Sequence, residues 1–103
     1  MLATKYSMNL QEVQIQYDVH CDWHGKPPIY RLYVNDEMFT ERTFIWQDKY
    51  LAETIPIAAE PGDYIITYEL HGAGQLTATN PRILDGPAEF VNQTTLRIHH
   101  VDA

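Results

Sequence analysis

The chain of 103 residues is poor in the groups that catalyse by nucleophilic attack, since it has one cysteine, Cys21, and one serine, Ser7. A single cysteine cannot form an intramolecular disulfide, so an oxidising compartment is not required. Cys21 lies on the apolar side of an alternating segment, where we expect a small buried side chain. The sequence contains no G-x-S-x-G motif and no phosphate-binding glycine loop. These absences argue against nucleophilic catalysis.

Basic residues are also scarce. Lysine and arginine number 7 against 14 acidic residues, which gives a formal net charge of −7. Nucleic acids and anionic membranes are bound by clustered lysine and arginine, and here no two basic residues are adjacent. No hydrophobic run approaches the length of a transmembrane helix, and residues 1–11 lack the apolar core of a signal peptide. We therefore expect a soluble, non-exported protein that binds neither nucleic acid nor a membrane.

The most regular pattern present is the alternation over Val13–His24, VQIQYDVHCDWH. Its odd positions are apolar and its even positions are polar. Because successive side chains of a strand point to opposite faces, the alternation predicts a half-buried β-strand. A helix is excluded, since a period of two would spread the apolar residues around its whole circumference. The odd positions, including Cys21 and Trp23, form the predicted core.

Short apolar or alternating segments separated by turn signals fill the rest of the chain. The further predicted strands are 29–34, 37–46, 53–58, 64–71, 75–80 with a continuation at 82–84, 88–92 and 95–101. Asn35-Asp36 predicts a tight hairpin turn, and the broken alternation after it predicts a β-bulge near Glu41–Thr43. Pro56 is typical of an edge strand, and 64–71, apolar on both faces, is typical of a central strand.

Seven to nine short strands and no substantial helix predict an all-β fold, an antiparallel β-sandwich of jelly-roll-like or immunoglobulin-like type. A small closed barrel is the alternative, and the pattern does not separate the two. At this length the chain forms one domain, residues 1–103. Residues 1–9 are weakly patterned and form either a frayed N-terminal arm or a short first strand.

A candidate metal site lies on the polar side of the alternating strand. Its residues are His20, Asp22 and His24. Side chains two positions apart on one strand face are about 7 Å apart, close enough for two imidazoles to reach one metal. Residues near the C-terminus would complete the site if the last strand lay beside the first: His99, His100 and Asp102. Such a site would hold zinc or a similar ion. Histidines on a solvated strand face without any metal are the alternative.

Acidic residues also gather in predicted turns. They are Asp36, Glu37, Asp48, Glu60, Asp63 and Asp85. Aspartate suits turn backbones, and no loop has the ligand spacing of an EF-hand. Sandwiches of the carbohydrate-binding kind often hold a structural calcium in such loops, so calcium stays open. We expect no cofactor, with a structural Ca²⁺ or Zn²⁺ as the alternative.

Aromatic residues make up 12% of the chain and include seven tyrosines. Exposed rings can stack on the faces of sugars or anchor a protein interface. The candidate platforms are Tyr33, Trp46 and Tyr50. The competing interpretation is that tyrosine covers half-buried sheet surface.

One stretch resembles a known group of proteins. The segment YRLYVNDEMFTERTFIW, Tyr30–Trp46, is followed by ETIPIAAEPGDYIITYEL. Over residues 29–70 the chain is similar to small uncharacterised all-β proteins of tailed phages of marine bacteria. In those proteins a strand, a VND-type turn, an ERT-aromatic strand and a Pro-Gly turn recur. The resemblance implies a viral product in the virion or the host cytoplasm, and it brings no assigned activity.

These observations favour a non-enzymatic structural or protein-interaction module that binds a protein partner or itself. The alternatives are a carbohydrate-binding module that uses Tyr33, Trp46 or Tyr50, and a small metal-binding protein. The carbohydrate-binding alternative implies a glycan as partner.

Overall fold

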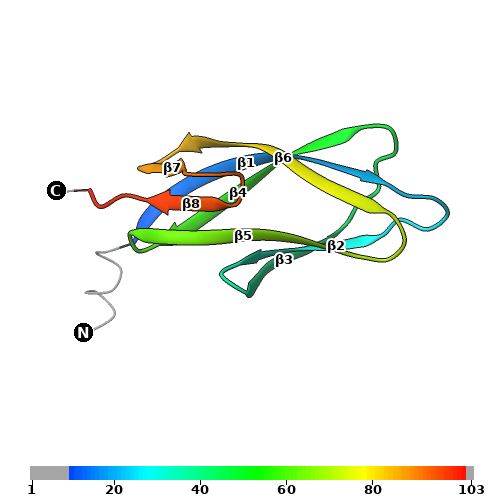
Figure 1. Cartoon of the computed structure of the whole chain (residues 1–103), viewed down its shortest axis with the longest axis horizontal. Coiled ribbons are helices and arrows are strands. Elements are labelled where there is room, and N and C mark those ends of the chain that lie inside the picture. Colours follow the sequence, from blue (N-terminus) through cyan, green and yellow to red (C-terminus); the bar gives the residue numbers. More distant parts are fainter. Residues whose placement is uncertain (1–9, 102–103) are drawn as a thin grey trace.

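The computed structural model describes residues 10–101, which form eight β-strands and no helix (Figure 1). The strands are β1 (Gln11–Asp22), β2 (Ile29–Val34), β3 (Glu37–Thr43), β4 (Tyr50–Ala59), β5 (Gly62–His71), β6 (Gln75–Asp85), β7 (Ala88–Phe90) and β8 (Thr95–Ile98). Two antiparallel sheets pack face to face, with orders β4-β1-β6 and β3-β2-β5-β8-β7. The predicted β-sandwich is confirmed, whereas the predicted arm at 1–9 lies outside the described residues. Within residues 10–101 no helix could cross a membrane.

The predicted opening strand is the centre of the three-stranded sheet, where β4 pairs with one edge of β1 and β6 with the other. Every odd position from Val13 to Cys21 is at most 2% exposed, and Trp23 follows at 8%. The Trp23 indole N–H donates to the carbonyl of Trp46 at 2.8 Å, which satisfies the one polar atom of the ring. Burial of each large apolar side chain contributes about 1.5–3 kcal/mol, so β1 carries much of the core.

The hairpin of β2 and β3 has the predicted turn but a different bulge. Asn35 and Asp36 both have left-handed φ, 49° and 68°, as a tight hairpin turn requires. Leu32 pairs with Thr40 and Tyr33 with Met38, so the extra residue is Phe39 and the bulge is not at Glu41–Thr43. Because the bulge at Phe39 precedes both Thr40 and Arg42, the alternation between them is unbroken. Their side chains therefore point to the same face of the sheet.

The strand predicted to continue to Trp46 ends at Thr43 instead. The Phe44 N–H donates to the Pro28 carbonyl at 2.9 Å, which continues the β2–β3 register by one residue beyond the strand ends. The ring of Phe44 is fully buried and packs edge-on against Tyr30, with centroids 6.0 Å apart. Beyond Phe44 the chain crosses to the other sheet, where β4 begins at Tyr50.

The remaining strands lie where they are predicted, but β4, β5 and β6 are longer than predicted and β7 and β8 are shorter. Pro56 lies on β4, an edge strand, where a missing N–H costs least. The strand predicted to be central, β5, lies between β2 and β8. The predicted continuation past Pro81 is confirmed, because β6 runs from Gln75 to Asp85 with a register shift against β1 at Pro81. The last two strands end earlier than predicted, at Phe90 and Ile98.

Candidate functional site

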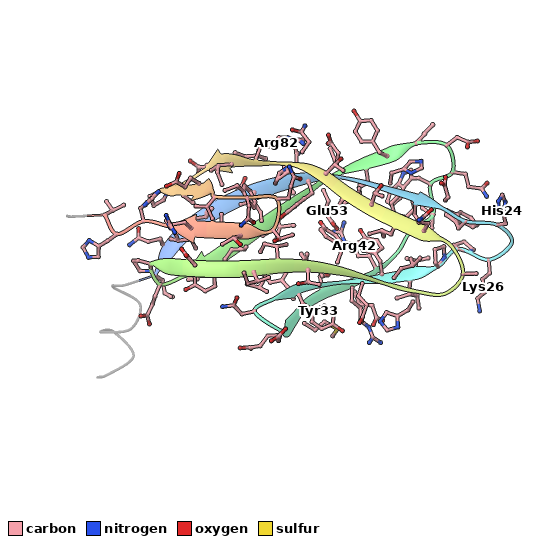
Figure 2. All side chains as sticks on the ribbon, in the orientation of Figure 1. His24, Lys26, Tyr33, Arg42, Glu53 and Arg82 are labelled. Carbon is pink, nitrogen blue, oxygen red and sulfur yellow. The ribbon has the colours of Figure 1, made fainter. Side chains whose placement is uncertain are left out.

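A buried carboxylate joins the two sheets at the centre of the sandwich. Glu53 of β4 is 3% exposed and is the single buried charged side chain of residues 10–101. The hydroxyls of Tyr30 and Tyr68 donate to its two oxygens at 2.8 and 2.7 Å, and Arg42 Nη1 lies 3.2 Å from Oε2. Figure 2 shows Glu53 and Arg42 facing one another between the sheets. We call Glu53, Tyr30, Tyr68 and Arg42 the Glu53 cluster.

The Glu53 cluster keeps its phenols protonated. Burial, followed by the nearby Glu53 charge, raises the pKa of both Tyr30 and Tyr68 far above the ordinary tyrosine value. A phenol that holds its proton remains a hydrogen-bond donor, which is what a carboxylate in an apolar layer requires. Half of the Arg42 side chain is exposed, at 53%, so its charge is partly solvated.

The Glu53 cluster fixes structure and offers no opening for a ligand. Within residues 10–101 no buried side-chain polar atom lacks a partner, and the Glu53 oxygens are shared between two hydroxyls and a guanidinium. Sequence reasoning missed the Glu53 cluster, although Glu53 has the same parity as the inward residues Ile55 and Ile57. That parity was the available signal, because an acidic residue in an inward register requires a buried partner.

A second feature is open to solvent: half of β5 has no neighbour on one side. β8 pairs only with Gly62–Ile65 of β5. One further backbone bond continues that register, from the Ile66 N–H to the Thr94 carbonyl at 2.8 Å. In this antiparallel register the residues before Thr94 would have to lie alongside Tyr68 and Leu70, but the chain reaches Thr94 from β7 through the turn at 91–94.

The direction of the main-chain groups on this half of β5 follows from two backbone hydrogen bonds at its start. Ile65 accepts from Asn35, at the β2 side, and Ile66 donates to Thr94, at the β8 side. Since successive residues of a strand direct their N–H and C=O to opposite edges, Tyr68 and Leu70 direct theirs toward the β8 side. No strand of residues 10–101 pairs with β5 there. These groups form an open edge.

The open edge lies over an apolar groove between the two sheets, with a volume of about 370 Å³. Its other wall is β6, the edge strand of the three-stranded sheet. The groove is lined by Tyr17, Ile65, Ile66, Thr67, Tyr68, Leu76, Ala78, Gln93 and Thr94. We call this the lateral groove. In the lateral groove, unpaired main-chain donors and acceptors lie next to apolar side chains.

One end of the lateral groove is held rigidly. The Tyr17 hydroxyl donates to the Gln93 carbonyl at 2.8 Å, and burial raises the pKa of Tyr17 to about 12. The Asn92 carboxamide oxygen accepts from the N–H groups of Thr94 and Thr95 at 3.0 and 2.8 Å. These bonds fix the turn at 92–95, so the groove has a defined end before any partner binds.

No family model matches this chain, and no curated protein or solved structure is significantly similar to it.

The predicted metal residues fall in two separate places. β8 pairs with β5 and β7, and β1 pairs with β4 and β6, so the strand pairing on which a joint site depended does not occur. Figure 2 places His24 at the turn end of β1, whereas the chain end beyond β8 lies at the opposite end of the molecule in Figure 1. His20 Nε2 is 3.9 Å from an Asp22 oxygen, and His99 Nε2 is 3.0 Å from Glu89.

No group of three or more histidine, cysteine, aspartate or glutamate side chains in residues 10–101 is arranged to hold a metal ion. His100 interacts with other groups of the protein, and Asp102 lies outside the described residues. The turn carboxylates are scattered, and Asp63 is bound to Arg97 at 2.9 Å. Zinc and calcium binding stay predictions that no arrangement described here supports.

The three predicted aromatic platforms do not share a surface. Tyr50 is 63% exposed and pairs with His20 on the outer face of the three-stranded sheet. Tyr33 lies on the outer face of the other sheet, where its hydroxyl donates to Glu69 at 3.0 Å (Figure 2). Trp46 is half-buried, and its ring packs edge-on against Phe44 at 5.2 Å. A glycan site would therefore rest on Tyr50 alone among these rings.

Proposed function

We propose that this protein is a non-enzymatic interaction module that binds an extended segment of a partner protein in the lateral groove. The observation that carries the proposal is the open edge of Tyr68 and Leu70 above an apolar floor. An unpaired strand edge binds an added strand through main-chain hydrogen bonds, and pockets beneath it receive alternate side chains. The resemblance of Tyr30–Trp46 to tailed-phage proteins suggests a partner in a virion or its host.

The other edges of the sandwich are protected against strand addition, which makes the lateral groove distinct. β4 carries Pro56, which cannot donate to an added strand, and β3 is interrupted by the bulge at Phe39. β7 has three residues, Ala88–Phe90, too few for a stable ladder. β6, the remaining edge strand, carries Pro81 and two register shifts in its second half, and its first half, with Leu76 and Ala78, lines the lateral groove itself. The contrast supports a function for the lateral groove.

The length of the open edge suits a short peptide. From Ile66 to His71 it spans six residues, which is about 20 Å of strand at about 3.3 Å per residue. A segment of this length buries a small interface, so we expect moderate affinity and reversible binding.

The proposal is tested by selecting peptides from a displayed random library against the protein and measuring their affinity for variants. Ala78→Lys places a charge on the groove floor, and Leu70→Pro removes an outward N–H while leaving the ladder to β2 intact. We expect each variant to weaken binding more than about tenfold, or about 1.4 kcal/mol. The matched control is Ala52→Lys, on the exposed face of β4, which should leave affinity unchanged.

Two results would contradict the proposal. The first is that no peptide is enriched over background. The second is that enriched peptides bind Ala78→Lys and Leu70→Pro as well as they bind Ala52→Lys. Circular dichroism and melting temperatures of all three variants separate a loss of binding from a loss of fold.

A further inference from the structure

The chemistry of the lateral groove specifies its partner further. This inference rests on the proposed function. We infer that the partner segment alternates apolar residues with lysine or arginine, the basic residue lying opposite Glu69. Two neighbouring features support this inference. Apolar side chains lie on the inner side of the open edge, and the exposed carboxylate of Glu69 lies on the outer side.

The main-chain groups of the open edge select an extended polypeptide. Tyr68 and Leu70 each present one N–H and one C=O on the same edge, two residues apart along β5. An extended chain repeats its own donors and acceptors at that spacing, about 7 Å, whereas a sugar or a small anion does not. The occupant is therefore a strand, and its side chains must alternate between the two faces of the sheet.

The inner face of such a strand meets apolar surface. Tyr17, Leu76 and Ala78 line the groove below the edge, and all three are buried or half-buried. The Tyr17 hydroxyl is already bound to Gln93, so it presents its ring to the groove and not a free donor. Every second residue of the partner should therefore be apolar, since a polar side chain there would lose its water without gaining a bond.

The outer face meets Glu69, which is exposed and has no lysine or arginine bound to it. Its side chain is 50% exposed and bonds to His71 at 2.6 Å and to the Tyr33 hydroxyl at 3.0 Å. Arg31 pairs with Glu69 in register, and after the His71 and Tyr33 hydrogen bonds its charge also lowers the Glu69 pKa, but its Nε binds Glu41 at 2.7 Å. No lysine or arginine within residues 10–101 forms a hydrogen bond to Glu69.

The other acidic residue of β5 shows what a strand neighbour provides at such a position. Asp63 pairs in register with Arg97 of β8, and the arginine Nε lies 2.9 Å from the aspartate oxygen. A partner strand that extends the sheet beyond Thr95, the first residue of β8, would place a side chain opposite Glu69 in the same way. Opposite charges across a strand pair are favourable, and like charges are unfavourable. The net charge of −7 adds a long-range attraction for basic segments.

The experiment uses the full chain and three synthetic peptides with identical valine positions. The intervening residues are lysine in the first peptide, glutamine in the second and glutamate in the third, and proline at both ends limits self-association. Affinities are measured by fluorescence anisotropy at low and high salt. We expect the lysine peptide to bind tightest and the glutamate peptide weakest. The lysine preference should fall about two- to fivefold in Glu69→Gln and shrink with salt. Asp36→Asn, which removes one charge at the β2–β3 turn on the β2 side of β5 and not at the open edge, is the matched control and should keep the preference.

The outcomes separate the two proposals. If all three peptides bind equally and Leu70→Pro abolishes their binding, the charge preference is overturned and the interaction module stands. If the lysine peptide binds but Leu70→Pro, Ala78→Lys and Glu69→Gln leave its affinity unchanged, the attraction is non-specific and the inference is overturned. If none of the peptides binds, the inference fails, and the library selection decides the proposed function independently.

Discussion

Replacing the buried carboxylate by an apolar side chain should strongly destabilise the fold. Glu53→Leu removes the acceptor of the Tyr30 and Tyr68 hydroxyls, which lie 2.8 and 2.7 Å from it. Each hydroxyl left unpaired in the interior costs about 1–3 kcal/mol, so the two together cost about 2–6 kcal/mol. A domain of this size is stable by about 5–15 kcal/mol, so the loss is a large fraction of the total.

A thermodynamic cycle tests whether the loss comes from the unpaired hydroxyls. The triple variant Glu53→Leu, Tyr30→Phe, Tyr68→Phe leaves no polar atom of the Glu53 cluster between the sheets and lets Arg42 turn to water. Replacing both sides of a buried polar pair by apolar groups is often close to neutral. We expect the triple variant to regain most of the stability that the single variant loses.

Urea denaturation followed by the fluorescence of Trp23 and Trp46 provides the free energies, since a single small domain usually unfolds in two states. The matched control is Glu41→Leu, which removes the exposed partner of Arg31 and should cost less than about 1 kcal/mol. The reasoning is refuted if Glu53→Leu costs no more than the control, or if the triple variant is no more stable than Glu53→Leu.

Three further predictions concern a glycine in a turn and the ionisation of aspartate and tyrosine side chains. Gly86→Ala should destabilise more than Gly25→Ala in the same urea assay, because a Cβ at Gly86 would lie 2.4 Å from the Glu12 carbonyl and nothing lies within 4 Å at Gly25; equal losses would contradict this. Below about pH 4 stability should fall, because hydrogen bonds from Arg82 and Arg97 lower the pKa of Asp18 and Asp63; this contribution is complete above the unfolded-chain pKa and is lost as pH falls through the folded one. Melting temperatures from pH 6 to 2 should fall less steeply for the double variant Asp18→Asn, Asp63→Asn than for the native chain, and parallel curves would refute the assignment. In alkali the buried tyrosines should ionise last, because burial raises the pKa of Tyr17 to about 12 and those of Tyr30 and Tyr68 further. Their stabilising contribution is complete below about pH 10 and declines above it, so tyrosinate absorbance should show a late step that coincides with unfolding, and an early single titration of all tyrosines would contradict it.

The local pattern of the sequence was enough to predict the strands but not their long-range pairing. Val13–His24 alternates without interruption, and its odd positions are buried as predicted. Asn35-Asp36 and Pro56 also have local meanings, a left-handed turn and an edge position, which the structure confirms. In each case one residue or a short period determines the backbone, so neighbours along the chain carry the information.

The site could not be predicted in this way, because it depends on which strands meet. The metal hypothesis required the last strand beside the first, and a topology in which β8 pairs with β5 separates His99 from His20. The lateral groove exists because β8 begins only at Thr95, opposite Ile65, while β5 continues to His71. A difference in the lengths of two neighbouring strands has no local signature in either of them.

The bulge and the Glu53 cluster fall between these cases. The broken alternation after Asn35-Asp36 required a bulge, but several positions restore the parity, and the local pattern does not distinguish Phe39 from the residues after it. The inward parity of Glu53 was visible beside Ile55 and Ile57. Its partners, which come from three strands of the other sheet, were not.

Backbone amide exchange measured by NMR tests the central claim most directly. In the free protein the amides of Tyr68 and Leu70 should exchange much faster than those of Thr67 and Glu69, which face β2. When the lysine peptide is added, the Tyr68 and Leu70 amides should become protected while amides of the β4 edge are unchanged. Slow exchange at Tyr68 and Leu70 in the free protein, or no added protection at peptide saturation, would contradict the account of an open edge that binds a partner strand.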